Sequence, residues 1–404
     1  MCEWASTKQS DTFVMMALEQ VSHYEVPDGQ LLTGHLAEFG ELLGRLEERR
    51  GLTVLVSDPL SGTSGLLAAA LKQTGQSYLA VDARRCADAL DLAMAIADAA
   101  IAALAPDASA WWLEAAPPSS TAGLRVWRTL SDHGIEPEGL RLGEGEGAAR
   151  LAQALDLISA LTTGPVVLAI DHIGHMLSNI RDAPAREILA ILRMARQRDG
   201  GLDLVLVDQP QGPISGALSD TQHPMYRAGE RVRLRRPTPS RVVEDLAIIK
   251  PSETTPIALL RTAAELAAGV PVLTWQVVAL ASADGDHVAR AVAGWEELRR
   301  ANAASVSQEW DLLRRVHPAA QTLVAAISLD LKPHGIPAAS KTVDDGLNRL
   351  RDVGLAWQPA QRTWAIADPL LAAFAREHSQ PWALRGRASA RIRASRSAGG
   401  SFTA

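Results

Sequence analysis

The chain has 404 residues, 47% of them apolar and 21% charged, a composition typical of a soluble globular protein with two or three domains. The net charge of −6 excludes a chain that binds nucleic acid over its whole surface, so any such binding must be local. The only cysteines, Cys2 and Cys86, exclude a disulfide scaffold and favour a cytoplasmic location, and neither a signal peptide nor a membrane span is expected.

The first half of the chain predicts strands that alternate with helices. Residues 1–30 are an extension with weak periodicity, and residues 31–50 predict a helix with Thr33 as its N-cap. The sequence then predicts a strand at 53–56, a helix at 66–71, a strand at 77–81 and a helix at 86–104. Residues 106–147 are rich in proline, serine and glycine and predict an irregular insertion.

The alternation continues after the insertion. Helices are predicted at 148–161 and 183–198, and strands at 165–170, 202–207 and 231–234. The run at 165–170 is apolar throughout, which is typical of a strand buried on both faces of a parallel sheet. These βαβ units predict an α/β fold with a doubly wound parallel sheet.

The second half changes character. Residues 240–281 are predicted to be mostly helical, interrupted at Pro251, Gly269 and Pro271. Within 305–380, helical spacing at 307–329, a helix at 340–353 ended by Gly354 and a hairpin of 355–357 with 363–366 predict a winged helix. The remaining residues, 381–404, predict a disordered basic tail with five arginines and no acid: Arg385, Arg387, Arg391, Arg393 and Arg396.

The turn after the first predicted strand has the spacing of a phosphate-binding loop. In G-x-x-x-x-G-K-[ST], backbone amides and a lysine hold phosphates while a hydroxyl binds the metal ion. Here the same positions are Ser57, Gly62, Thr63 and Ser64. The second glycine and the hydroxyl are present, but the first glycine and the lysine are not.

These features together resemble the AAA+-like P-loop ATPases of the archaeal-ATPase, origin-recognition and STAND grouping. Residues 32–39 resemble the "f-x-G-R-x-x-E" opening of that module, with His35 in place of arginine. Residues 166–171 resemble the Walker B strand, 204–207 the sensor-1 strand, and 264–277 the "GG-x-P" helix of the lid. The resemblance implies a P-loop NTPase-like core over 31–239, a helical lid over 240–304 and an α+β winged-helix domain over 305–380.

The chain departs from this family at the positions that carry its chemistry. The Walker B aspartate is normally followed by a glutamate that polarises water, but here the pair is Asp171-His172. The sensor-1 position carries Asp208-Gln209 instead of asparagine, serine or threonine. We therefore expect no catalytic residue and weak or lost binding of ATP or ADP with Mg²⁺. The candidate nucleotide-binding residues of the chain are Ser57, Gly62, Thr63, Ser64, Asp171 and His172.

Three of these sequence features also have a simpler interpretation. The loop is also compatible with an ordinary strand-to-helix turn. Asp171, His172 and His175 could suggest a metal site or a catalytic pair, but no further ligand is evident. A strand-end aspartate with two polar loop histidines is favoured, and no metal site is predicted. The arginines at 231, 233, 235 and 236 fit phosphate contacts or the solvated face of an alternating strand equally well.

The predicted winged helix supplies candidates for DNA contact. In DNA-reading members of this class the helix at 340–353 would enter the major groove and the hairpin tip would touch the backbone. Asp344, Asp345 and Asp352 on the same helix would repel phosphates. The candidates are Ser340, Lys341, Thr342, Asn348, Arg349 and Arg351, Arg362 on the hairpin, and the five tail arginines.

Three functions follow as hypotheses. The first is a DNA-binding, initiator-like or regulatory protein with a degenerate nucleotide site, which can form homo- or hetero-oligomers. The second is an atypical active ATPase whose lysine comes from elsewhere, with Lys72 poorly placed for the role. The third is a protein-interaction adaptor or sensor subunit of a defence or signalling complex.

Overall fold

The computed structural model describes two compact units of the chain. One unit is His35–Arg236, and the other contains the described residues that follow Arg236. The predicted extension, the body of the insertion and the basic tail lie outside the described residues. The described residues are 34–104, 147–162, 164–198, 201–210, 212–249, 255–282, 284–336, 339–360 and 363–379.

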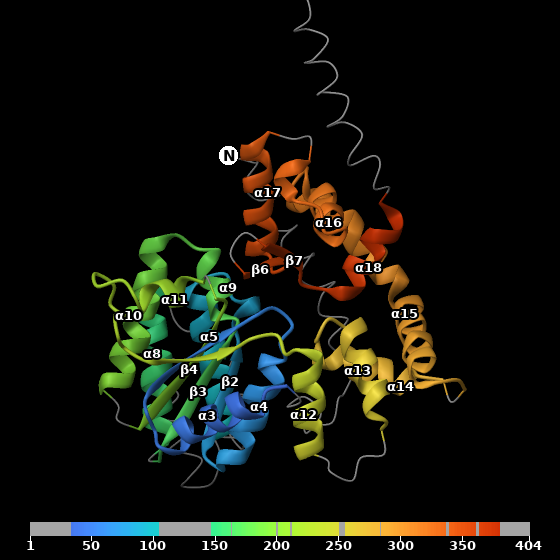
Figure 1. Cartoon of the computed structure of the whole chain (residues 1–404). Coiled ribbons are helices and arrows are strands. Elements are labelled where there is room, and N and C mark those ends of the chain that lie inside the picture. The colour runs from blue at the N-terminus through green and yellow to red at the C-terminus, as the bar shows by residue number, and fades with distance from the viewer. Residues whose placement is uncertain are drawn as a thin grey trace, which may run out of the picture. The chain divides into compact units, whose positions relative to one another are not determined.

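The first unit contains a five-stranded parallel sheet with the strand order β2-β3-β4-β1-β5 (Figure 1). Its strands are β1 (Leu52–Ser57), β2 (Ser77–Asp82), β3 (Val166–Asp171), β4 (Leu202–Asp208) and β5 (Glu230–Leu234). All four neighbouring pairs are parallel, so the carboxyl ends of the strands meet at one edge of the sheet. Ligands of open α/β sheets bind at this edge.

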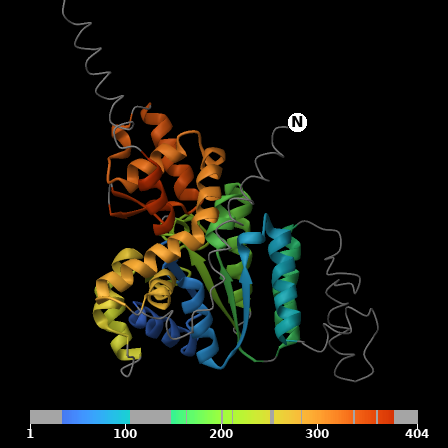
Figure 2. The same cartoon turned by 90° about the vertical axis from the view of Figure 1, so that its right-hand side faces the viewer.

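Helices cover both faces of this sheet (Figure 2). They are α3 (Leu36–Glu47), α4 (Thr63–Thr74), η2 (Ala83–Arg85), α5 (Ala89–Leu104), α8 (Gly147–Leu161), α9 (Ile173–Ser178), α10 (Asp182–Arg198) and α11 (Pro213–Ala217). Leu52, Val54 and Val56 of β1 pack in one core with α5, α8 and α10, whereas the intervening Leu55 is also fully buried. Burial on both faces explains why the central strands are continuous apolar runs.

The prediction of a doubly wound parallel sheet is confirmed, and its five strands lie within two residues of their predicted limits. The first helix is shorter than predicted. Gly34 has a φ of 92° and Arg49 a φ of 53°, both outside the helical region, so α3 runs only from Leu36 to Glu47. Its N-cap is His35 and not Thr33, which precedes the described residues.

The helix predicted from residue 86 begins later, at Ala89. The side chain of Asp88 accepts hydrogen bonds from the backbone N–H groups of Leu90 and Asp91 at 2.9 and 3.1 Å. These contacts satisfy amide groups that the first helical turn leaves open, so Asp88 sets the start of α5.

The second unit begins with three helices where the resemblance places the lid. These are α12 (Pro239–Ile249), α13 (Ile257–Leu266) and α14 (Pro271–Leu280). Residues 264–277 are therefore not one helix. Ala268 and Gly269 have φ angles of 49° and 75°, and Pro271 starts the next helix, so the predicted break separates α13 from α14.

The C-terminal part contains the predicted helix at 340–353 and the predicted hairpin. Its elements are α15 (His287–Val316), α16 (Ala320–Ser328), η3 (Pro333–Gly335), α17 (Ser340–Asp352), β6 (Ala356–Ala360), β7 (Thr363–Ile366) and α18 (Pro369–His378). The stretch 307–329 is divided between α15 and α16, and α18 was not predicted. Strands β6 and β7 pair antiparallel, and Gly354, with a φ of 76°, follows the end of α17 as predicted. In the described ranges, no helix is long and apolar enough to cross a membrane.

Candidate functional site

The loop between β1 and α4 joins a buried strand to the N-terminus of a helix. Gly62 has a φ of 87° and is the N-cap of α4. Glycine adopts this left-handed conformation without steric cost, which gives the second glycine of the loop pattern a physical role here. Ser57, at the position of the first glycine, is the last residue of β1 and lies opposite Leu234 of β5.

Side chains from outside the loop hold its backbone. Nε2 of the fully buried His35 lies 2.6 Å from the carbonyl oxygen of Ser61. Nη2 of Arg236 donates to the carbonyl of Pro59 at 2.8 Å, and the backbone N–H of Arg236 donates to Asp58 at 3.0 Å. His35 stands where the resemblance expects an arginine, and here it braces the loop. The loop therefore keeps its shape through contacts within the protein.

Two carboxylates lie side by side at the carboxyl edge of the sheet. Asp82 ends β2 and Asp171 ends β3, and they are opposite each other in the parallel register. Oγ of Ser64 donates to Oδ2 of Asp171 at 2.5 Å, and the backbone N–H of His172 donates to Oδ1 at 2.8 Å. The structure thus brings together three of the six predicted nucleotide-site residues.

The ring of His172 lies against both carboxylates. Its Nδ1 atom is 3.1 Å from Oδ1 of Asp171 and 3.4 Å from Oδ1 of Asp82. The residue has a φ of 55°, which is uncommon outside glycine and turns the chain sharply after β3. The residue that replaces the catalytic glutamate therefore engages the acidic groups and adds no carboxylate of its own.

Asp82 is held in its charged form. Burial alone would raise the pKa of its carboxyl group, but hydrogen bonds from His172 and Arg84 outweigh burial and keep the pKa well below its usual value. Nε of Arg84 lies 2.9 Å from Oδ2 of Asp82, and Nη2 lies 2.6 Å from the same oxygen. A carboxylate with such a low pKa is a poor general base near neutral pH.

Asp208, at the end of β4, is buried, with 2% of its surface exposed. Burial raises the pKa of its carboxyl group to about 6, although the backbone N–H of Ser215 donates to Oδ2 at 2.7 Å. No described residue gives its Oδ1 atom a hydrogen bond. A Cβ atom added at Gly174 or Gly212 would come within 1.9 or 1.8 Å of this oxygen. The carboxylate therefore depends on two glycines for its space.

The donor set fits a magnesium–nucleotide complex only in part. Ser64 and Asp171 supply the hydroxyl and carboxylate oxygens that Mg²⁺ prefers, and α4 presents its first amide groups. Thr63 stands in the lysine position, with its hydroxyl 3.1 Å from Oγ of Ser61. Lys72, the only lysine in residues 35–236, lies in the last turn of α4. That turn is about 13 Å along the helix from its start.

Among the described residues, no group of three histidine, cysteine, aspartate or glutamate side chains is placed to hold a metal ion. Nε2 of His175 lies 3.2 Å from Nδ2 of Asn179, one turn further along its helix.

The candidate DNA-binding residues of α17 lie partly on an exposed face. Lys341, Thr342, Asn348 and Arg349 are exposed, as is Ser340. Arg351 differs from the prediction: it is half-buried, and its Nη2 atom lies 3.6 Å from Oδ1 of Asp352. Arg362 and the tail arginines at 385, 387, 391, 393 and 396 lie outside the described residues.

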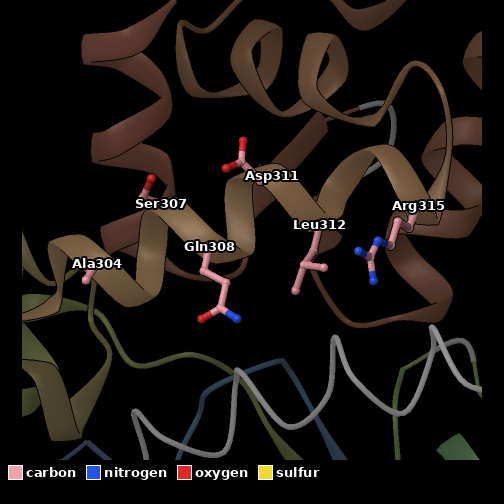
Figure 3. A pocket seen from close by; sticks show the side chains of 6 residues that line it. All are labelled: Ala304, Ser307, Gln308, Asp311, Leu312 and Arg315. Atoms are coloured by element: carbon pink, nitrogen blue, oxygen red, sulfur yellow. The ribbon is translucent and has the colours of Figure 1, made fainter.

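A hollow of about 520 Å³ runs along α15 in the second unit (Figure 3). Its lining residues recur at helical spacing on a single face of that helix, and none is a predicted site residue. They are Ala304, Ser307, Gln308, Asp311, Leu312 and Arg315.

The sequence interpretation did not count several residues of the carboxyl edge among its site candidates. Asp58, Asp82 and Asp208 each stand where an apolar strand ends, and this position was the available signal. The bracing roles of His35 and Arg236 left no such signal, because their partners lie 26 and 177 residues away.

No protein-family model and no curated protein matches the chain. Among solved structures, a Walker-type ATPase of Pyrococcus abyssi matches 85% of this chain and 96% of its own, with a TM-score of 0.56 and 19% identity. The ORC2 protein of Aeropyrum pernix, solved as ADPNP–ADP complexes, matches 88% of this chain and 93% of its own, with a TM-score of 0.46 and 15% identity.

A signal-transduction STAND ATPase with a tetratricopeptide repeat sensor, from Pyrococcus horikoshii, matches 88% of this chain and 45% of its own, with a TM-score of 0.33 and 11% identity. The fold assignment rests on the Pyrococcus abyssi enzyme together with the parallel sheet and its strand-loop-helix unit. The chain therefore has the fold of the AAA+-like P-loop ATPases.

Proposed function

We propose that the protein is an initiator-like or regulatory DNA-binding scaffold whose nucleotide site no longer hydrolyses ATP. One observation carries the first half of this proposal. The Ser64 hydroxyl and the Asp171 carboxylate contact each other, while threonine and histidine occupy the positions of the loop lysine and the catalytic glutamate.

The missing groups are those on which phosphoryl transfer depends. Transfer of a γ-phosphoryl group requires positioning and stabilisation of negative charge, with little covalent work by the protein. Removing one such group typically costs about 10²–10³ in rate. With both the lysine and the glutamate absent, we expect turnover at the background rate.

Nucleotide binding is proposed to be weak. The amide groups at the start of α4, together with Ser64 and Asp171, would hold phosphate and Mg²⁺, and the metal ion would screen phosphate charge. Calorimetry with ATP and Mg²⁺ tests this, with Gly62→Glu as the blocked control. We expect Thr63→Lys to tighten binding at least tenfold. Equal affinity of Thr63→Lys and wild type for ATP would contradict the view that the loop is a degenerate phosphate site.

The proposal of DNA binding rests on α17 and the tail. Lys341 and Arg349 are exposed and, within the described ranges, have no acidic partner. Nε2 of His334 lies 2.8 Å from Asp344, so one of the acidic side chains on α17 has a basic neighbour. The five tail arginines would add salt-dependent affinity that does not depend on DNA sequence.

The DNA-binding half is tested by titrating a labelled duplex at several salt concentrations. We expect Lys341→Ala/Arg349→Ala, and separately deletion of residues 381–404, to weaken binding and flatten its salt dependence. Glu297→Ala, an exposed substitution on α15, is the control. If wild type binds no DNA at low salt, the adaptor hypothesis takes the place of this one.

An active ATPase is disfavoured by the position of Lys72. The last turn of α4 lies too far from the loop for this side chain to replace the loop lysine. ATP turnover that Asp171→Ala abolishes would nonetheless restore this hypothesis.

A further inference from the structure

The edge strand β5 carries Arg231 and Arg233, and Arg235 directly follows its last residue, Leu234. Arg231, Arg233 and Arg235 are exposed, whereas Val232 and Leu234 between them are buried. Alternation along the strand places Arg231 and Arg233 on one face of the sheet. We refer to Arg231, Arg233 and Arg235 as the β5 arginines.

The same face of the sheet is buried at the neighbouring strand, β1. Arg231 and Arg233 pair in register with Val54 and Val56 of β1, which are 0% and 5% exposed and belong to the core under α5, α8 and α10. The helical layer therefore covers the face at β1 but leaves it open at β5. At the open position the side chains change from valine to arginine.

The charge of the β5 arginines is not neutralised. Nη2 of Arg231 donates to the carbonyl of Ser215 at 2.8 Å and to Oγ of Ser219 at 2.7 Å, and both groups are uncharged. Arg233 and Arg235 have no ion pair or hydrogen bond with any described residue.

The one acidic residue of this strand is already engaged. Glu230 pairs with Arg45 of α3, and its Oε2 atom lies 3.7 Å from Nη1 of Arg50. Residues 227–236 hold five arginines against this one glutamate, in a chain whose net charge is −6. The strand is thus a local cationic stripe on an acidic protein.

We propose that the β5 arginines form a second DNA-binding surface, which contacts the phosphate backbone of a duplex from the sheet-containing unit. The proposal rests on the DNA-binding function proposed above. Arg231 and Arg233 lie on one face of a rigid strand about 6.6 Å apart, and Arg235 directly follows the strand, so the three cations offer repeated charge to a polyanion with regularly spaced phosphates. The strand itself carries no aromatic side chain on which unpaired bases would stack, so contact with the duplex backbone is favoured over single-stranded DNA.

Phosphate contacts of this kind position DNA without reading its sequence. Each phosphate neutralised releases counterions and adds about 0.9 to the slope of log affinity against log salt. Removing Arg233 and Arg235 should therefore reduce the steepness of that slope by about 1.8. Between 50 and 200 mM salt, the factor by which affinity falls would be about twelve times smaller for the variant than for wild type.

The experiment titrates a fluorescein-labelled duplex with full-length protein over that salt range and follows anisotropy. The variants are Arg233→Ala/Arg235→Ala, the charge-keeping Arg233→Lys/Arg235→Lys, and a matched control, Arg181→Ala/Arg198→Ala, whose two arginines are exposed at the two ends of α10. We expect the alanine pair to flatten the slope and the lysine pair and control to keep it. Far-ultraviolet circular dichroism checks that each variant is folded, and the uncharged pair Arg233→Gln/Arg235→Gln replaces the alanine pair if that pair unfolds.

The outcomes separate this inference from the proposed function. Wild-type DNA binding with an unchanged slope in the alanine pair overturns the β5 surface and leaves the winged-helix proposal standing. If the salt dependence of DNA binding flattens in Arg233→Ala/Arg235→Ala but not in Lys341→Ala/Arg349→Ala, the result supports the β5 surface and contradicts the role of α17. Absence of wild-type DNA binding overturns both proposals.

Discussion

Asp208 couples the stability of the sheet edge to pH. Its carboxyl group is buried between Gly174 and Gly212, and burial raises its pKa from 3.8 to about 6. Because the folded state then binds the proton more tightly than the unfolded state, this group stabilises the fold below about pH 4. That contribution is lost as pH rises through about 6.

Asp208→Asn should therefore remove a pH-dependent loss of stability. A pKa raised by about 2 corresponds to about 3 kcal/mol, since one unit is worth about 1.4 kcal/mol. Urea unfolding of wild type and variant at pH 4 and pH 8 measures the difference. From pH 4 to pH 8, the free energy of unfolding of the variant should rise relative to that of wild type by up to about 3 kcal/mol. The exposed Asp220→Asn is the control, and parallel curves for wild type and Asp208→Asn would refute the assignment.

At the scale of elements, α14 and α15 approach closely at Gly294. A Cβ atom there would lie 2.3 Å from the backbone carbonyl oxygen of Val277 and 3.0 Å from the backbone nitrogen of Ala281. Both neighbours are backbone atoms, so relief requires that a helix move. The close packing of these two helices therefore depends on the absence of a side chain at this position.

Gly294→Ala should destabilise the second unit by about 1–3 kcal/mol, the range for overpacked sites. Gly40→Ala in α3 is the control, because no atom lies within 4 Å of its added Cβ and alanine favours a helix interior by about 1 kcal/mol. Denaturation followed by circular dichroism at 222 nm compares them. Equal or greater stability of Gly294→Ala would show that the helices are not in such close contact.

The packing of α18 on α15 includes two buried acids. Glu309 and Asp368 are 3% and 4% exposed, and the carboxylate of Asp368 accepts the backbone N–H of Leu370 at 2.7 Å at the start of α18. Burial, and then the charge of Asp368, raise the pKa of Glu309 to about 8. A raised folded pKa means that stability is lost as pH rises through about 8.

Glu309→Gln keeps this position neutral at every pH. We expect the melting temperature of wild type to fall between pH 5 and pH 8, and that of the variant to fall less. Glu297→Gln, exposed on the same helix, should follow wild type. If Glu309→Gln and wild type lose stability in parallel, the buried acid is not responsible.

At the scale of the molecule, the sequence predicted the sheet better than the site. Strands β1, β3 and β4 are buried on both faces and so are mainly apolar along their length, whereas β5 was located from its alternation. Helix limits were less certain because they depend on caps and single backbone angles, as at Gly34 and Asp88.

The candidate site could likewise be predicted only in part. Ser64 and Asp171 follow from the spacing of a loop and the end of a strand, and the structure places them in contact. The position of His172 against Asp82 depends on the order of strands, which neighbouring residues do not encode. The stripe of arginines on β5 was visible as an alternation, but its openness required knowledge that β5 is an edge strand.

The most direct test of the central claim is steady-state ATP turnover by the purified full-length protein with Mg²⁺, with and without duplex DNA. The comparison is with Asp171→Ala, which removes the remaining metal-binding carboxylate of the predicted site. We expect the two proteins to be indistinguishable, because neither has the lysine or the glutamate that phosphoryl transfer uses. Turnover by wild type that Asp171→Ala abolishes would contradict the account and identify an active ATPase.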